Sequence, residues 1–201
     1  MRAGDVLLKS RHAVHEDEFG DAGATLLALE FRADDPFAPP DTADLWRPRS
    51  DAVAMRHATA LLEAALNQDE CSVSVAGADL VAGCCDHTPQ RSPPDWIKRL
   101  AIELEERSLA DISIARRARE AGVHPAHASR LFRQCHGQSI TEYAQAQSVR
   151  RALAGLAQFD QPLSQVAASA GFYDQSHMNR VFRRVIGRSP QQQRSLLVAA
   201  G

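Results

Sequence analysis

RLFRQCHGQS (residues 130–139) returns fifty positions later as RVFRRVIGRS (residues 180–189). Both stretches follow the pattern Arg-x-Phe-Arg-x-x-x-Gly-x-Ser, and a histidine stands three residues before each, at His127 and His177. Further upstream, Ala121-Gly122-Val123 matches Ala170-Gly171-Phe172. A repeat of this period indicates that one supersecondary unit is present twice.

The residues around the first copy predict two helices joined by a glycine turn. Ser108 or Asp111 can cap a helix that ends at Ala121-Gly122. His124-Pro125 begins the next helix, with proline in the first turn, where its missing N–H does no harm.

The second copy has the same layout. Ser139-Ile140-Thr141-Glu142 has the spacing of a capping box and opens a long connecting helix to about residue 158. Pro162 then starts a helix, and Gly171 turns into the last paired helix, which includes Phe182. The sequence therefore predicts a helix-turn-helix, a connecting helix and a second helix-turn-helix.

A helix-turn-helix needs small residues where its helices cross and polar residues on the outer face of its second helix, which enters the major groove of DNA. The packing positions are filled by Ala118, Gly122, Leu131 and Phe132 in the first copy and by Ala167, Gly171, Met178, Val181 and Phe182 in the second. The outward positions, our candidate DNA-binding residues, are Ala126, His127, Ser129, Arg130, Arg133, Gln175, Ser176, His177, Asn179, Arg180, Arg183 and Arg184.

Arginine carries most of the chemistry in this set. We expect Arg130 and Arg180 to contact a base or a phosphate, because the guanidinium fork fits guanine and phosphate oxygens. We expect Arg133, Arg183 and Arg184 to hold phosphates. The alternative for each is an ion pair on the protein surface. The amides of the helix capped by Ser139 can also meet a phosphate.

The charge of the chain is divided between its halves. Residues 1–90 hold 7 Lys or Arg against 16 Asp or Glu, a net of −9, whereas residues 91–201 hold 16 against 9, a net of +7. An acidic half joined to an arginine-rich half suggests a nucleic-acid-binding module attached to something else.

The second copy carries a highly specific signature. GFYDQSHMNRVFRR at 171–184, followed by Gly187-Arg188-Ser189-Pro190, resembles the DNA-binding domain of the AraC/XylS family of bacterial transcription regulators, as does the first copy around Arg130-Leu131-Phe132-Arg133. The resemblance implies two recognition helices in successive major-groove segments, about 34 Å apart. It also implies double-stranded DNA and RNA polymerase as partners, a homodimer, and an effector that the sequence does not identify.

Some positions of this chain depart from the family pattern. Ala128 stands where relatives carry a large aliphatic residue, Arg117 where they bury an apolar one, and residues 143–149 where many are arginine-rich. Gln191-Gln192-Gln193-Arg194 lacks the usual tyrosine. We therefore expect the first unit to pack less tightly and to read DNA more weakly than the second.

The N-terminal part resembles the end of a cupin-type sensor barrel, on Gly4-Asp5-Val6-Leu7-Leu8, Phe19-Gly20 and Leu29-Glu30-Phe31. Two short apolar runs there fit buried strands. His12 and His15 are read either as a metal-site remnant or as a solvated loop, and we favour the loop. Helical patterns follow from about Ser50 to Gln68 and from about Val73 to Cys84.

The predicted fold is mainly α with a small β N-terminal part. Residues 1–38 form a partial cupin-like β region, and residues 39–92 hold linker helices that are the candidate site of self-association. Residues 93–198 form the DNA-binding domain. In it the first helix-turn-helix spans about 108–136, the connecting helix about 139–158 and the second helix-turn-helix about 162–186.

Other classes of protein fit the sequence less well. No run of about 18 apolar residues exists, and the acidic N-terminus is unlike a signal peptide, so we expect a cytoplasmic protein. Cys84-Cys85-Asp86-His87 leaves a tetrahedral metal site incomplete and reads as a plain helix end. We expect no catalytic residue, cofactor or metal.

The favoured function is sequence-specific DNA binding by a transcription regulator. The main alternative is a degenerate regulator that binds protein, for example a full-length relative. A cupin enzyme ranks last, because it needs a complete set of metal ligands and this sequence does not show one.

Overall fold

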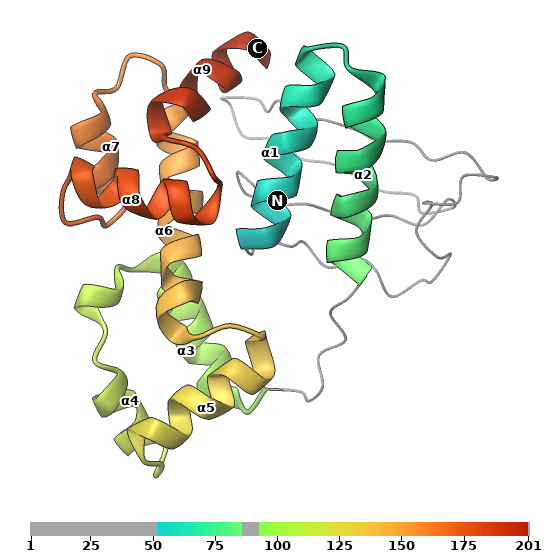
Figure 1. The fold of residues 1–201 in the computed structure, drawn as a ribbon. Coiled ribbons are helices and arrows are strands. Elements are labelled where there is room, and N and C mark those ends of the chain that lie inside the picture. Colours follow the sequence, from blue (N-terminus) through green and yellow to red (C-terminus); the bar gives the residue numbers. More distant parts are fainter. Residues whose placement is uncertain (1–51, 86–92, 201) are drawn as a thin grey trace, which may run out of the picture.

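The computed structural model describes residues 52–85 and 93–200, in which helices are joined by short turns and no strand occurs (Figure 1). The mainly helical class is confirmed for these ranges. The predicted strands, the His12 and His15 loop and the Asp86-His87 end of the cysteine motif lie outside the described residues.

The first repeat unit consists of α3 (Asp95–Glu106), the short 3-10 helix η1 (Leu109–Asp111), α4 (Ile114–Glu120) and α5 (Pro125–His136). The predicted cap of α4 is wrong. Ser113 caps it, accepting a hydrogen bond from the Arg116 amide at 3.3 Å, because Ser108 is used one turn earlier to cap η1. Gly122 has φ of +70° in the turn between α4 and α5, a conformation that favours glycine.

The second unit consists of α7 (Leu163–Ser169), α8 (Gln175–Val185) and α9 (Pro190–Ala200), and α6 (Ile140–Leu156) joins it to the first. The predicted capping box of α6 is confirmed: Ser139 and Glu142 exchange side-chain-to-backbone hydrogen bonds. Asp174 caps α8 by accepting from the His177 amide at 2.6 Å, and Gly171 supplies the turn with φ of +81°.

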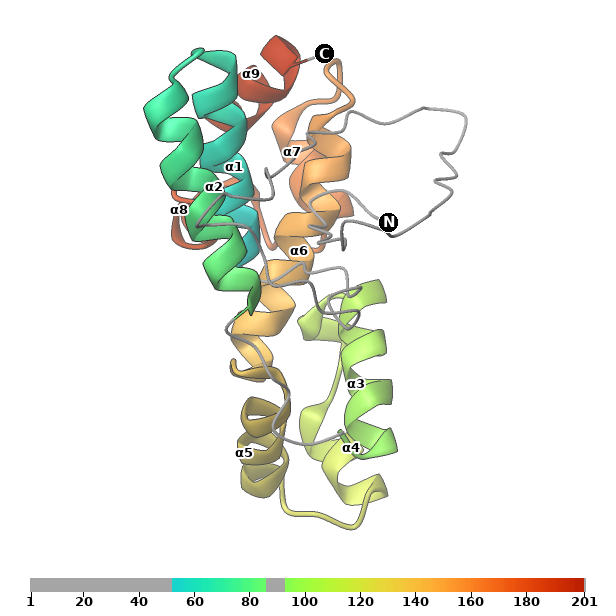
Figure 2. The ribbon, with the colours of Figure 1, turned by 90° about the vertical axis from the view of Figure 1, so that its right-hand side faces the viewer.

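Each unit has its own hydrophobic core, and α6 contributes to both. Ile140 and Ala144, near its start, pack with Phe132 and the apolar face of α3. The later turns of α6, down to Leu156, pack with Phe182 and the other apolar residues of α7 and α8. Phe132 and Phe182 are both fully buried, so their prediction as core residues is confirmed. In Figures 1 and 2, α6 forms a spine with one unit at each end.

The helices α1 (Ala52–Leu66) and α2 (Glu70–Cys85) lie side by side as a hairpin. Helix α2 begins about three residues before the predicted Val73. The Asp69 carboxylate accepts from the Ser72 amide at 3.2 Å and from the Ser72 hydroxyl at 2.6 Å, which starts the helix at Glu70.

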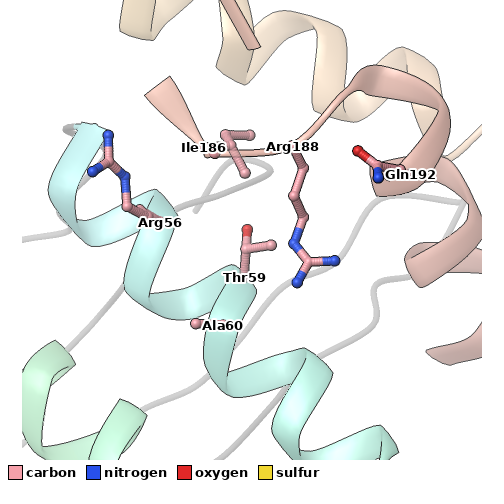
Figure 3. Close-up of a pocket in the computed structure, with 7 residues that line it drawn as sticks. Arg56, Thr59, Ala60, Ile186, Arg188 and Gln192 are labelled. Carbon is pink, nitrogen blue, oxygen red and sulfur yellow. The ribbon is translucent and has the colours of Figure 1, made fainter. Parts of the chain in front are cut away.

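The hairpin packs on the second unit through α1. Met55 is buried in the same core as Phe182. Arg56 donates to the carbonyl oxygens of Arg184 at 2.8 Å and Val185 at 3.4 Å, at the C-terminal end of α8. Figure 3 shows Arg56 and Arg188 around a cavity of about 400 Å³ at this junction, and Arg188 also pairs with Glu63. Helix α1 therefore packs with the second unit, although the whole first unit lies between them in the sequence.

Candidate nucleic-acid interface

Helix α5 separates an apolar face from a polar one. Ala128 and Phe132 are buried against the first core. The five predicted outward residues are all exposed, namely Ala126, His127, Ser129, Arg130 and Arg133. The helix begins at Pro125 because the His124 side chain caps it, accepting from the Ala126 amide at 3.2 Å. The outward face is thus mainly polar and carries two arginines.

Helix α8 shows the same division more strongly. Its buried face consists of Met178, Val181, Phe182 and Val185. Among the predicted outward residues, the structure exposes Gln175, Ser176, Arg180, Arg183 and Arg184 and leaves His177 and Asn179 half-buried. Three exposed arginines on an otherwise polar surface give this face a positive charge.

His177 takes part in the local structure of the turn. Its Nδ1 accepts a hydrogen bond from the Tyr173 amide at 3.4 Å, and its ring meets the Phe172 ring edge-on at 5.6 Å between centroids. The side chain therefore stabilises the entry to α8, in addition to any contact it makes outward.

The outward arginines differ in their partners within the described residues. Arg133 pairs with Glu142 at 3.6 Å, and Arg184 donates to the Gln145 side-chain oxygen at 3.3 Å. Among the residues that the structure describes, Arg130, Arg180 and Arg183 have no ion pair or side-chain hydrogen bond. The surface ion pair considered as the alternative applies to Arg133, whereas these other three guanidinium groups remain available to a ligand.

Known proteins match the part of the chain that holds these two helices. A family model described as a helix-turn-helix domain matches residues 117–195, from α4 into α9. The arabinose operon regulatory proteins of Salmonella typhimurium and Escherichia coli are each 32% identical over 105 residues, which cover 51% of this chain. Residues 117–195 thus match an AraC-type helix-turn-helix domain.

The match is partial for the relatives as well. It spans 37% of the length of the Salmonella protein and 36% of the Escherichia coli protein. Two solved structures are also similar at 22% identity. The C-terminal domain of AraT, a response regulator from Geobacillus stearothermophilus, has a TM-score of 0.47 over 52% of this chain and 88% of its own. A DNA-binding transcriptional dual regulator from Escherichia coli K-12 has a TM-score of 0.43 over 51% and 97%.

The departures from the AraC/XylS pattern have structural counterparts. Arg117 does not enter the core; it donates to both carboxylate oxygens of Glu103, at 2.6 and 2.8 Å, and to Glu120 at 3.0 Å. The hydrogen bonds from Arg117 lower the pKa of Glu103 below its ordinary value. This pair joins α4 to α3 where an apolar contact was expected. Tyr143, in the segment that lacks arginine, packs edge-on against Phe132 and donates to Glu105 at 2.9 Å.

The helices that follow α5 and α8 differ in their caps. At the start of α6, the Glu142 carboxylate accepts from the Ser139 amide at 2.8 Å, and hydrogen bonding to the Ser139 side chain and amide lowers the pKa of Glu142. At the start of α9, the neutral Gln192 fills the same place and accepts from the Ser189 amide at 2.9 Å. The N-terminus of α9 therefore keeps its positive potential, whereas a carboxylate offsets that of α6.

One exposed residue beside the site was missed. Tyr173 is 93% exposed and lies directly before the cap of α8, on the signature stretch, but sequence reasoning gave it no role. An aromatic residue in an otherwise polar turn was the available signal. Within the described residues, no cluster of His, Cys, Asp and Glu that could hold a metal occurs, and no helix is long and apolar enough to cross a membrane.

Proposed function

We propose that this protein is a transcription regulator that binds specific DNA sequences through α5 and α8, each in a segment of the major groove. The observation that carries the proposal is the outer face of α8. It presents Arg180 and Arg183 without protein partners in the described residues, on a helix whose inner face is fixed in a core. A rigid helix with free, forked donors suits the reading of base edges and phosphates.

We assign different roles to the two arginines. Arg180 contacts a base, and Arg183 contacts a phosphate. The same division applies to Arg130 and Arg133 on α5, with Arg133 released from Glu142 when a phosphate takes the place of the carboxylate. The resemblance to AraC/XylS regulators completes the proposal with a homodimer, an effector-sensing N-terminal region, contact with RNA polymerase and a cytoplasmic location.

Selection of duplexes from a random pool by the purified chain, at two salt concentrations, tests the DNA-binding proposal. We expect a motif with two elements about one helical turn apart and an affinity that falls steeply with salt. Recovery of one element alone would mean that only α8 recognises the DNA sequence. No enrichment at either salt would refute DNA binding and favour the protein-binding alternative, which the comparisons do not support.

Arginine variants then test the assigned roles against the recovered motif. Arg180→Ala should cost about 1–3 kcal/mol and relax the preference at one base pair, whereas Arg183→Ala should weaken binding to all sequences alike and flatten the salt dependence. Lys98→Ala is the matched control, because it removes an exposed positive charge from α3, where Lys98 pairs with Asp95 at 3.3 Å. An unchanged base preference in Arg180→Ala would refute its reading role.

A further inference from the structure

A single arginine of α6 lies where the two helix-turn-helix units meet. Through its Nη1, Arg151 donates to the carbonyl oxygens of Glu105 at 2.9 Å and Leu104 at 3.3 Å, in the last turn of α3. Through Nε and Nη2 it donates to the carbonyl oxygen of Ala170, the C-cap of α7, at 3.3 Å. One guanidinium thus binds the C-terminal ends of two helices from different units.

The chemistry of this contact favours arginine. The last carbonyls of a helix have no partner within the helix and carry a partial negative charge. A guanidinium has donors on three nitrogens in one plane, so it can serve two helix ends at once, whereas the ammonium of lysine is a point charge. The Ser148 hydroxyl, one turn earlier on α6, accepts from Nη2 at 3.0 Å and orients the fork. Half-burial of the group strengthens these bonds.

A second contact joins the units at the same place. The Ser108 hydroxyl donates to the carbonyl oxygen of Gly171 at 3.2 Å, linking the end of the first unit's α3 to the turn before α8. The fit is close, because a Cβ built on Gly171 would lie 3.0 Å from the Cβ of Ser108 and 3.6 Å from Nη2 of Arg151. The junction therefore consists of Arg151, Ser108 and Gly171.

We infer that this junction sets the distance and rotation between the two recognition helices, and so the spacing of the DNA elements that the chain binds. The inference rests on the proposed function and goes beyond it. Helix α6 gives the direction from one unit to the other, but each unit is held to it by its own separate core. The hydrogen bonds of Arg151 and Ser108 stop one unit from rotating about α6 relative to the other.

Rigid spacing affects affinity in a defined way. When one recognition helix is bound, the other meets its element at an effective concentration that is high at the matching spacing and low elsewhere. A loosened junction therefore lowers the affinity for DNA at the best spacing. At spacings that the native junction excludes, the affinity becomes a larger fraction of that best value. Arg151 and Ser108 are positioning residues in this scheme, since they are assigned no contact with DNA.

The test compares duplexes that carry the two selected elements at the recovered spacing, at that spacing with one to five base pairs inserted, and with one element scrambled. For the native chain, we expect affinity to fall sharply at the first insertions. For Arg151→Met, we expect about tenfold weaker binding at the best spacing, a flatter dependence on insertion, and unchanged binding to the single element. Arg151→Lys and Ser108→Ala, which disturb the fold less, should show the same flattening to a smaller degree.

Lys98→Met is the control, because it removes a positive charge from α3 away from the junction; its spacing profile should be native. Equal steepness in the native chain and in all three junction variants would overturn the inference while leaving the proposed function intact. Failure of the native chain to bind any duplex would overturn the proposed function first. A flatter dependence of affinity on spacing in Arg151→Lys and Ser108→Ala, with thermal unfolding curves like those of the native chain, would support the junction as the feature that sets the spacing.

Discussion

Gly171 and Gly122 occupy the same place in the two repeat units, so the effect of alanine at each can be compared directly. Both have positive φ, +81° and +70°. An L-residue in this conformation costs about 1–2 kcal/mol. Their surroundings differ: a Cβ on Gly122 meets nothing within 4 Å among the described residues, whereas a Cβ on Gly171 lies 3.0 Å from the Cβ of Ser108.

We therefore expect Gly122→Ala to lower the free energy of unfolding by about 1–2 kcal/mol, the cost of the backbone conformation alone. Gly171→Ala adds an overpacked contact, since carbon atoms prefer separations of about 3.5–4.0 Å. Overpacking costs about 1–3 kcal/mol more, which gives a total loss of about 2–5 kcal/mol for Gly171→Ala. Urea denaturation followed by circular dichroism measures both values.

A double-mutant cycle with Ser108→Gly isolates the contact. Removing the Cβ of Ser108 should restore about 1–2 kcal/mol to Gly171→Ala beyond the additive expectation and nothing to Gly122→Ala. Equal losses for the two alanine variants, or additivity between Ser108→Gly and Gly171→Ala, would refute the close packing at the junction between the units.

Three further predictions concern charge, pH and the N-terminal hairpin. Glu142→Gln should strengthen DNA binding a few-fold and Gln192→Glu should weaken it similarly, since each changes the charge at a helix N-terminus and keeps its cap; opposite or absent shifts in titrations with the selected duplex would contradict this. Burial lowers the pKa of His136, whose ring stacks on Phe132 at 4.3 Å, so the unfolded chain binds the proton more readily. Neutral His136 makes its full contribution to the free energy of unfolding above the unfolded-state pKa of about 6.5, and this contribution is lost as the pH falls below that value. His136→Phe should therefore remove this part of the pH dependence of thermal unfolding. Met55→Ala should cost about 2–5 kcal/mol, whereas Val53→Ala, at a site 49% exposed, should cost under about 1 kcal/mol; similar urea midpoints for the two would show that α1 does not stabilise the second unit.

The sequence predicted best those features that depend on neighbouring residues. The repeat, the Ser139 capping box, the start of α5 at Pro125 and the burial of Phe132 and Phe182 follow from local pattern, and the structure confirms them. The start of α2 and the cap of α4 were wrong, because several polar residues near each helix start could serve as caps and sequence alone does not rank them.

Contacts between distant residues were out of reach. Arg117 looked like an intrusion into the core, but its partner Glu103 lies on another helix. Arg151 gave no signal, because its acceptors are backbone carbonyls at Leu104, Glu105 and Ala170, and every residue type has a carbonyl. The roles of the outward residues in DNA binding stay predictions, since they depend on a partner molecule.

The packing of α1 on α8 and α9 has a consequence for how the chain is made. Arg56 and Arg184, which hold this contact, lie 128 residues apart, so α1 leaves the ribosome long before its packing partners exist. At about 5–20 residues per second, that delay is on the order of ten seconds. During that interval the apolar face around Met55 is uncovered, while the first unit, whose core spans residues 97–144, can already fold. The α1–α2 hairpin thus can pack in its final place only after α8 has been made, although it is synthesised before either helix-turn-helix unit.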